Sequence, residues 1–102
     1  MKIAIASSGK DENSEVSPSA GRAPYFLIYE NNKLIETIKN PFAIGGGGAG
    51  FAVAKMLKDK NVNLIVAGQF GGNMIGALEE KDIKKKELYD ITIKEALEKI
   101  EE

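Results

Sequence analysis

The residues best suited to chemistry in this chain are two glycine-rich segments, a single arginine and two nearby serines. Residues 45–50 contain five glycines and one alanine, and residues 68–73 contain three glycines and end at Asn73. Glycines leave backbone N–H groups accessible, and a helix that follows such a loop presents its positive end to an anion. Arg22 is the only arginine, and a guanidinium can bind an oxyanion through two hydrogen bonds. These features together predict an anion-binding site.

Known phosphate-binding motifs do not account for residues 45–50. The segment matches G-x-G-x-x-G, but it follows an Asn-Pro break rather than a strand, and no acidic residue lies about 20 positions further on in a second strand. Residues 51–52 are Phe and Ala where a P-loop needs Lys and Ser or Thr. A mobile linker is the alternative interpretation of this segment. Residues 68–73 lie between a predicted strand and helix, a usual place for ligands in α/β sheets, although Asn73 would also serve as a helix N-cap.

The polar residues of the segment before residue 25 have structural alternatives as well. Arg22 would form either an anion contact or a salt bridge, and Ser17 and Ser19 would donate to an anion or stabilise loop turns. Three acidic residues near the start of the segment are expected to be solvated rather than to hold a hard cation; they are Asp11, Glu12 and Glu15.

Composition excludes several classes of site. The chain has no Cys, His or Trp, so it can form no disulfide, no common zinc or thiolate-held iron–sulfur site and no Cys/His or Ser/His/Asp hydrolase site. The charges nearly balance, with 14 basic and 15 acidic side chains, which argues against nucleic acid as a partner. No apolar run reaches the roughly 18–20 residues of a membrane span, and no signal peptide is visible. We therefore expect a cytoplasmic protein with no membrane association.

The hydrophobic pattern predicts one α/β domain over residues 1–102. Strands are expected at residues 2–6, 25–29, 34–39, 64–67 and, as a weak edge strand with three lysines, 83–88. Helices are expected from residue 49 to about 60, from 74 to 80, and after the capping box formed by Thr92 and Glu95. This order predicts a mixed sheet with parallel central strands, one antiparallel edge and helices on its faces. The polar residues 7–24 read as a long loop, either functional or mobile.

Three segments resemble the dinitrogenase iron–molybdenum cofactor biosynthesis family. Residues 17–26, S-P-S-A-G-R-A-P-Y-F, are similar to its S-x-H-F-G-R-A-P-Y-F segment, and Asn40-Pro41 followed by G-A-G at residues 48–50 is similar to its N-P…G-A-G loop. Residues 67–73 resemble its third loop, and the spacing agrees from residue 2 to residue 100.

The resemblance implies a three-layer α/β/α sandwich of the ribonuclease H-like type, with a five-stranded mixed sheet and no nuclease activity. It also implies iron–molybdenum cofactor or an iron–sulfur cluster as cargo, and a protein partner in cofactor assembly. The family's loop histidine falls on Ser19 and its neighbouring phenylalanine on Ala20. Because the chain has neither His nor Cys, direct ligation of a cluster iron by its side chains is not expected.

The leading hypothesis is a small binding protein, not an enzyme, that holds an anionic small molecule or metal cluster without a side-chain metal ligand. No catalytic residue is predicted, because the chain offers no poised base or nucleophile. The alternative is a protein–protein interaction or scaffold module that has lost cofactor binding. The predicted ligand-binding residues come from all three segments: Ser17, Ser19, Arg22, Gly46, Gly47, Gly48, Gly50, Gly68, Gly71 and Asn73.

Overall fold

The computed structural model describes residues 1–44 and 48–100, and its elements follow the predicted order. Strand bounds differ from the expected ones by at most one residue. In chain order the elements are β1 (Lys2–Ser7), β2 (Tyr25–Glu30), β3 (Lys33–Lys39), α1 (Ala49–Asp59), β4 (Leu64–Ala67), α2 (Gly72–Glu80), β5 (Lys84–Glu87) and α3 (Ile93–Ile100).

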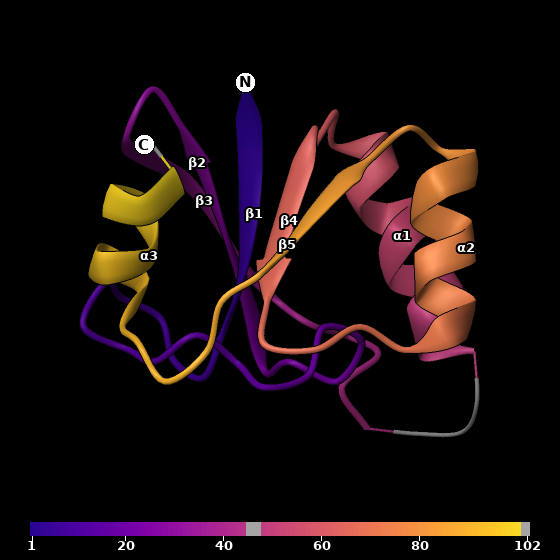
Figure 1. The fold of residues 1–102 in the computed structure, drawn as a ribbon, viewed down its shortest axis with the longest axis horizontal. Helices are drawn as coiled ribbons and strands as arrows, with labels where there is room; N and C mark the ends of the chain where they lie inside the picture. Colours follow the sequence, from indigo (N-terminus) through magenta and orange to yellow (C-terminus); the bar gives the residue numbers. More distant parts are fainter. Residues whose placement is uncertain (45–47, 101–102) are drawn as a thin grey trace.

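The strands form one mixed sheet in the order β3-β2-β1-β4-β5. β1 pairs with β2 antiparallel and with β4 parallel, β2 pairs with β3 antiparallel, and β4 pairs with β5 parallel. Helices α1 and α2 lie on one side of this sheet and α3 lies on the other (Figure 1). This arrangement confirms the three-layer α/β/α sandwich and the ribonuclease H-like architecture. The three lysines of β5 are exposed at a sheet edge, as expected of residues that discourage pairing with another sheet.

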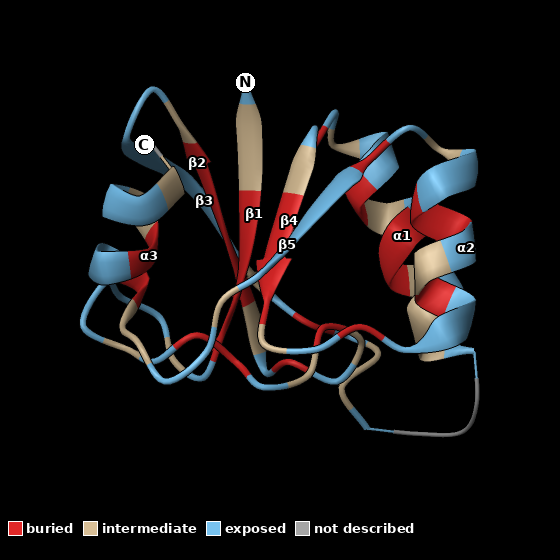
Figure 2. Ribbon diagram, in the orientation of Figure 1, coloured by how far each residue is buried: buried red, intermediate tan, exposed pale blue. Residues whose placement is uncertain are grey.

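Strand β1 separates two hydrophobic cores, because its side chains alternate between the two faces of the sheet. Ala4 and Ala6 join the core under α1 and α2, whereas Ile5 joins the core under α3. All three side chains are fully buried, in agreement with a strand that is covered on both faces. Figure 2 shows this buried band running through the middle of the sheet and along the inner faces of the helices.

The segment between β1 and β2 is held against the sheet by backbone hydrogen bonds, which argues against the mobile interpretation of residues 7–24. The Ser17 amide donates to the Ala6 carbonyl over 2.8 Å, and the Ala20 amide donates to the Gln69 carbonyl over 3.0 Å. Ala20 and Ala23 are buried although no apolar periodicity marks the segment. These bonds place residues 17–23 across the carboxyl ends of β1 and β4.

Helices α1 and α2, which lie on the same side of the sheet, both begin without a side-chain cap. Helix α1 starts after Gly48, whose φ of 88° is a left-handed conformation that favours glycine. Helix α2 starts after Gly71, so the prediction that Asn73 is its N-cap is wrong; Asn73 lies inside the first turn. The predicted capping box of α3 is confirmed, since Thr92 and Glu95 exchange hydrogen bonds of 2.9 and 3.2 Å. No helix in the described ranges is long and apolar enough to cross a membrane.

Candidate functional site

A small pocket of about 270 Å³ lies where the beginnings of α1 and α2 meet the loop before β2. It is lined by Ser19, Gly21 and Arg22 from that loop and by residues 48–50 and 71–74 from the two helix starts. The structure therefore brings together most of the predicted ligand-binding residues, from three separate segments of the chain. We call this pocket the glycine cradle.

The strand topology places the two helix starts side by side. β3 and β4 both run parallel to β1, so their carboxyl ends lie at the same edge of the sheet, and α1 and α2 follow them from that edge (Figure 1). The two helices touch at Gly50, where a Cβ atom would lie 2.9 Å from Cβ of Met74. Glycine at position 50 thus permits the close approach that forms one wall of the cradle.

Each of the two helices leaves the amides of its first turn without an acceptor inside the helix. The Ala52 amide donates to the Gly48 carbonyl over 3.1 Å and the Ile75 amide donates to the Gly71 carbonyl over 3.0 Å. Within the described part of the chain, the amides at positions 49–51 and 72–74 that precede these bonds have no hydrogen-bond acceptor. Two helix starts that point into one pocket add their partial positive charges, which favours an anion there.

Two side chains of the loop complete the donor set. The Ser19 hydroxyl oxygen accepts the Arg22 amide over 3.2 Å, which leaves the hydroxyl proton for a ligand. The Arg22 guanidinium donates from Nη1 to the Phe42 carbonyl over 3.3 Å, which helps to hold it beside the cradle. Arg22 is the only charged residue in the described lining of the cradle, so the net side-chain charge of that lining is positive.

Sequence reasoning missed two residues that shape this site. A Cβ atom at Gly21 would lie 3.6 Å from the Gly50 amide nitrogen, so a side chain at position 21 would cover one of the amides. Asn40 is buried and donates from Nδ2 to the carbonyls of Gly21 and Ala23 over 3.0 and 2.9 Å. In the sequence, the Asn-Pro pair marks the end of a strand and forms part of the resemblance to the family, but neither pattern assigns Asn40 a place in the site. Its place in the family motif is the signal that would have pointed to it.

The structure places the remaining predicted residues behind the cradle or outside the described ranges. Ser17 is buried, and its hydroxyl donates to the Ser19 carbonyl over 2.9 Å, which stabilises the loop turn. Gly68 does not line the pocket; a Cβ there would lie 2.9 Å from Cα of Pro18. Gly46 and Gly47 lie outside the described residues. Asp11, Glu12 and Glu15 are exposed, as expected of solvated charges.

The donor set of the cradle suits an anion rather than a metal cation. Amides, a hydroxyl and a guanidinium all donate hydrogen bonds, whereas metal cations need oxygen, nitrogen or sulfur lone pairs. No group of three or more His, Cys, Asp or Glu residues gathers in the described part of the chain. The residues present therefore fit an anion held by hydrogen bonds, and they do not fit a cluster ligated through iron by Cys or His.

Comparison with known proteins agrees with the resemblance in the sequence. The family model described as dinitrogenase iron-molybdenum cofactor matches residues 1–102. The chain belongs to this family. No curated protein matches the sequence significantly.

Two solved structures are similar to this chain. The apo form of the orange protein from Desulfovibrio gigas is 24% identical over 97% of this chain and 85% of its own, with a TM-score of 0.90, which supports the fold. A putative NifB protein from Thermotoga is 31% identical over 98% of this chain and 86% of its own, with a TM-score of 0.84. As a member of the dinitrogenase iron-molybdenum cofactor family, the chain is a small cofactor-related protein.

Proposed function

We propose that this protein is a cytoplasmic, non-enzymatic carrier that binds an oxyanion or an anionic metal–sulfur cluster in the glycine cradle. The observation that carries the proposal is the convergence of two uncapped helix starts, Ser19 and Arg22 on one pocket with no acidic residue in its described lining. The family membership supports cofactor cargo as the biological context. Cargo would be held by hydrogen bonds to its outer atoms and not by a bond from a side chain to a metal.

The magnitudes predict weak binding for a simple oxyanion. A helix start contributes about 0.3–1 kcal/mol to anion binding, and a hydrogen bond to a charged group contributes about 1.5–3 kcal/mol. Two helix starts and Arg22 together give about 4 kcal/mol before the entropic cost of association, so the Kd should be about 1 mM or weaker. A larger anionic cluster would contact more amides and bind more tightly. Such affinities suit a carrier that must release its cargo.

Titration of the isotopically labelled protein with molybdate at low ionic strength, followed by two-dimensional NMR, tests this proposal. Saturable shifts are expected at the amides of Gly50 and Asn73, and added salt should weaken the binding. Arg22→Ala should raise the Kd about tenfold, which corresponds to about 1.4 kcal/mol. Lys33→Ala is the matched control, because it removes the same charge from an exposed position outside the cradle. Equal effects of the two variants, or shifts located elsewhere, would contradict the proposal.

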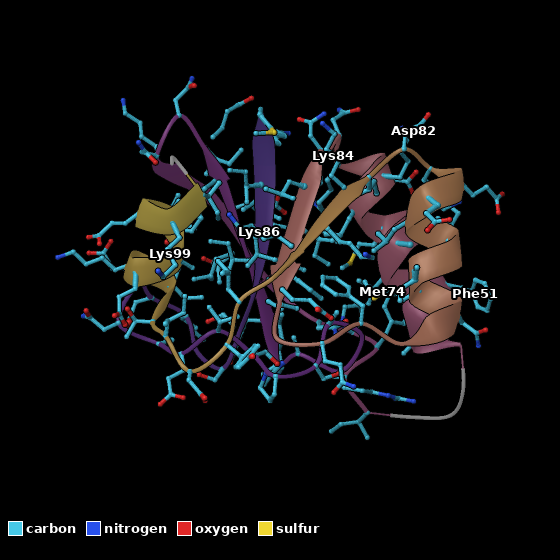
Figure 3. All side chains as sticks on the ribbon, viewed as in Figure 1. Phe51, Met74, Asp82, Lys84, Lys86 and Lys99 are labelled. Carbon is cyan, nitrogen blue, oxygen red and sulfur yellow. The ribbon has the colours of Figure 1, made fainter. Side chains whose placement is uncertain are left out.

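A scaffold module that has lost cofactor binding is the second candidate function. Two large apolar side chains near the cradle favour it: Ile44 is 93% exposed and Phe51 is 53% exposed. Figure 3 shows Phe51 pointing away from the sheet, on the outer side of the helices. Purification from the native cell without oxygen distinguishes the candidates. Colourless protein that contains no molybdenum or iron and that co-purifies with a stoichiometric partner would favour the scaffold.

A further inference from the structure

A larger groove of about 620 Å³ adjoins the glycine cradle, and Arg22 lines both of them. The groove lies where the hairpin of β2 and β3 meets the chain that leads towards α1. Its wall includes Pro24, Pro41 and Ile44, together with Tyr25 and Lys39, which face each other across β2 and β3. The oxyanion proposed for the cradle has no apolar part that could pack against these side chains. The groove is therefore better suited to a ligand with an apolar part.

The charged side chains in the described lining of the groove are all positive. Arg22 and Lys39 are its only charged residues among the described lining, and both are positive. Tyr25 itself lies near a further cation, since Nζ of Lys10 is 5.8 Å from the centroid of its ring. A volume of about 620 Å³ falls within the usual range of about 300–1,000 Å³ for small-molecule sites, which combine apolar walls with a few placed polar groups.

We infer that this groove binds the apolar body of an organic anion whose negative group pairs with Arg22 and Lys39. The inference rests on the proposed function in one respect, because in both of them Arg22 donates hydrogen bonds to the anion. The ligand class is an organic carboxylate, sulfonate or phosphate with a flat apolar body. Such a body would lie against Tyr25 and the prolines, and its negative group would lie next to the cradle.

Naphthalene-2-sulfonate serves as the probe, because it combines a flat apolar body with one negative group. NMR titration of the labelled full chain should give saturable shifts at the amides of Tyr25, Lys39 and Ala43. Naphthalene-2-methanol, which has the same body without the charge, should bind at least about fivefold more weakly. Lys39→Glu should raise the Kd for the sulfonate about fivefold or more, and Lys33→Glu less than about twofold. The two variants reverse the same charge at opposite ends of β3, both at exposed positions.

Several results would overturn the inference. These are equal effects of the two charge reversals, equal binding of the neutral compound, or shifts confined to another part of the molecule. A parallel titration with molybdate separates this inference from the proposed function. If molybdate shifts the cradle amides and the sulfonate leaves the groove unchanged, the groove inference fails alone. If neither probe causes shifts, both fail.

Discussion

Replacing Gly50 with alanine tests whether the contact between α1 and α2 builds the glycine cradle. The added Cβ would lie 2.9 Å from Cβ of Met74 and 3.2 Å from its Cα and amide nitrogen. Carbon atoms attract best at about 3.5–4.0 Å, so one helix must move by several tenths of an ångström. Met74 cannot avoid the contact by changing rotamer, because these atoms belong to its backbone or adjoin it.

The free energy of unfolding should therefore fall even though alanine favours helix. Overpacking costs about 1–3 kcal/mol, whereas replacing glycine by alanine inside a helix gains about 1 kcal/mol. The gain is smaller at the second residue of α1, so a net loss of about 1–2 kcal/mol is expected. At about 4–8 °C per kcal/mol for a domain of this size, Tm should fall by about 5–15 °C.

Gly76→Ala is the matched control, because Gly76 lies inside α2 and a Cβ there would meet nothing within 4 Å. This variant should gain up to about 1 kcal/mol from helix propensity alone. Urea unfolding followed by circular dichroism measures both changes, and the molybdate titration measures the cradle. Gly50→Ala should weaken molybdate binding at least about threefold, and Gly76→Ala should leave it unchanged. If Gly50→Ala stabilises the protein as much as Gly76→Ala does, the reasoning about the helix contact is refuted.

Two further predictions concern the loop and α3. Asn40→Ala should lower the free energy of unfolding by about 2–4 kcal/mol and weaken molybdate binding, because it leaves the buried carbonyl of Ala23 and the part-buried carbonyl of Gly21 without their donors. A loss below about 0.5 kcal/mol in urea unfolding would contradict this role. Hydrogen bonds from the amide and the hydroxyl of Thr92 lower the pKa of the Glu95 carboxyl in the folded protein. The ionised carboxylate therefore stabilises the fold fully at pH values above the ordinary Glu pKa, and this contribution is lost as the pH falls through the lowered pKa of the folded state. Glu95→Gln should therefore reduce the acid-induced loss of Tm, whereas Glu98→Gln, a change on the same helix outside the capping box, should reduce it less; equal pH profiles of the two variants would refute the assignment.

Local patterns predicted the order of elements because their causes are local. The alternation of Ile and Ala in β1 is typical of a strand buried on both faces, and the structure buries Ala4, Ile5 and Ala6 completely. The capping box of Thr92 and Glu95 is likewise contained within four residues. Asn73 was misassigned because an asparagine before an apolar run is typical of an N-cap. Extended backbone at Gly71, with φ −73° and ψ 156°, lets the helix begin one residue before Asn73.

The sequence by itself determined the fold class, the family and the kinds of donor that a site could contain. Because it lacks Cys and His, it offers none of the usual side-chain ligands of a cluster iron, and its single arginine provides one candidate guanidinium. Only the tertiary structure decided which donors meet. Residues 17–23 carry no periodicity, and their place is set by hydrogen bonds to β1 and to the end of β4. Gly50 contacts Met74, and Arg22 lines two cavities together with residues far from it in the chain. These contacts exist only once the sheet has brought the carboxyl ends of its parallel strands to one edge.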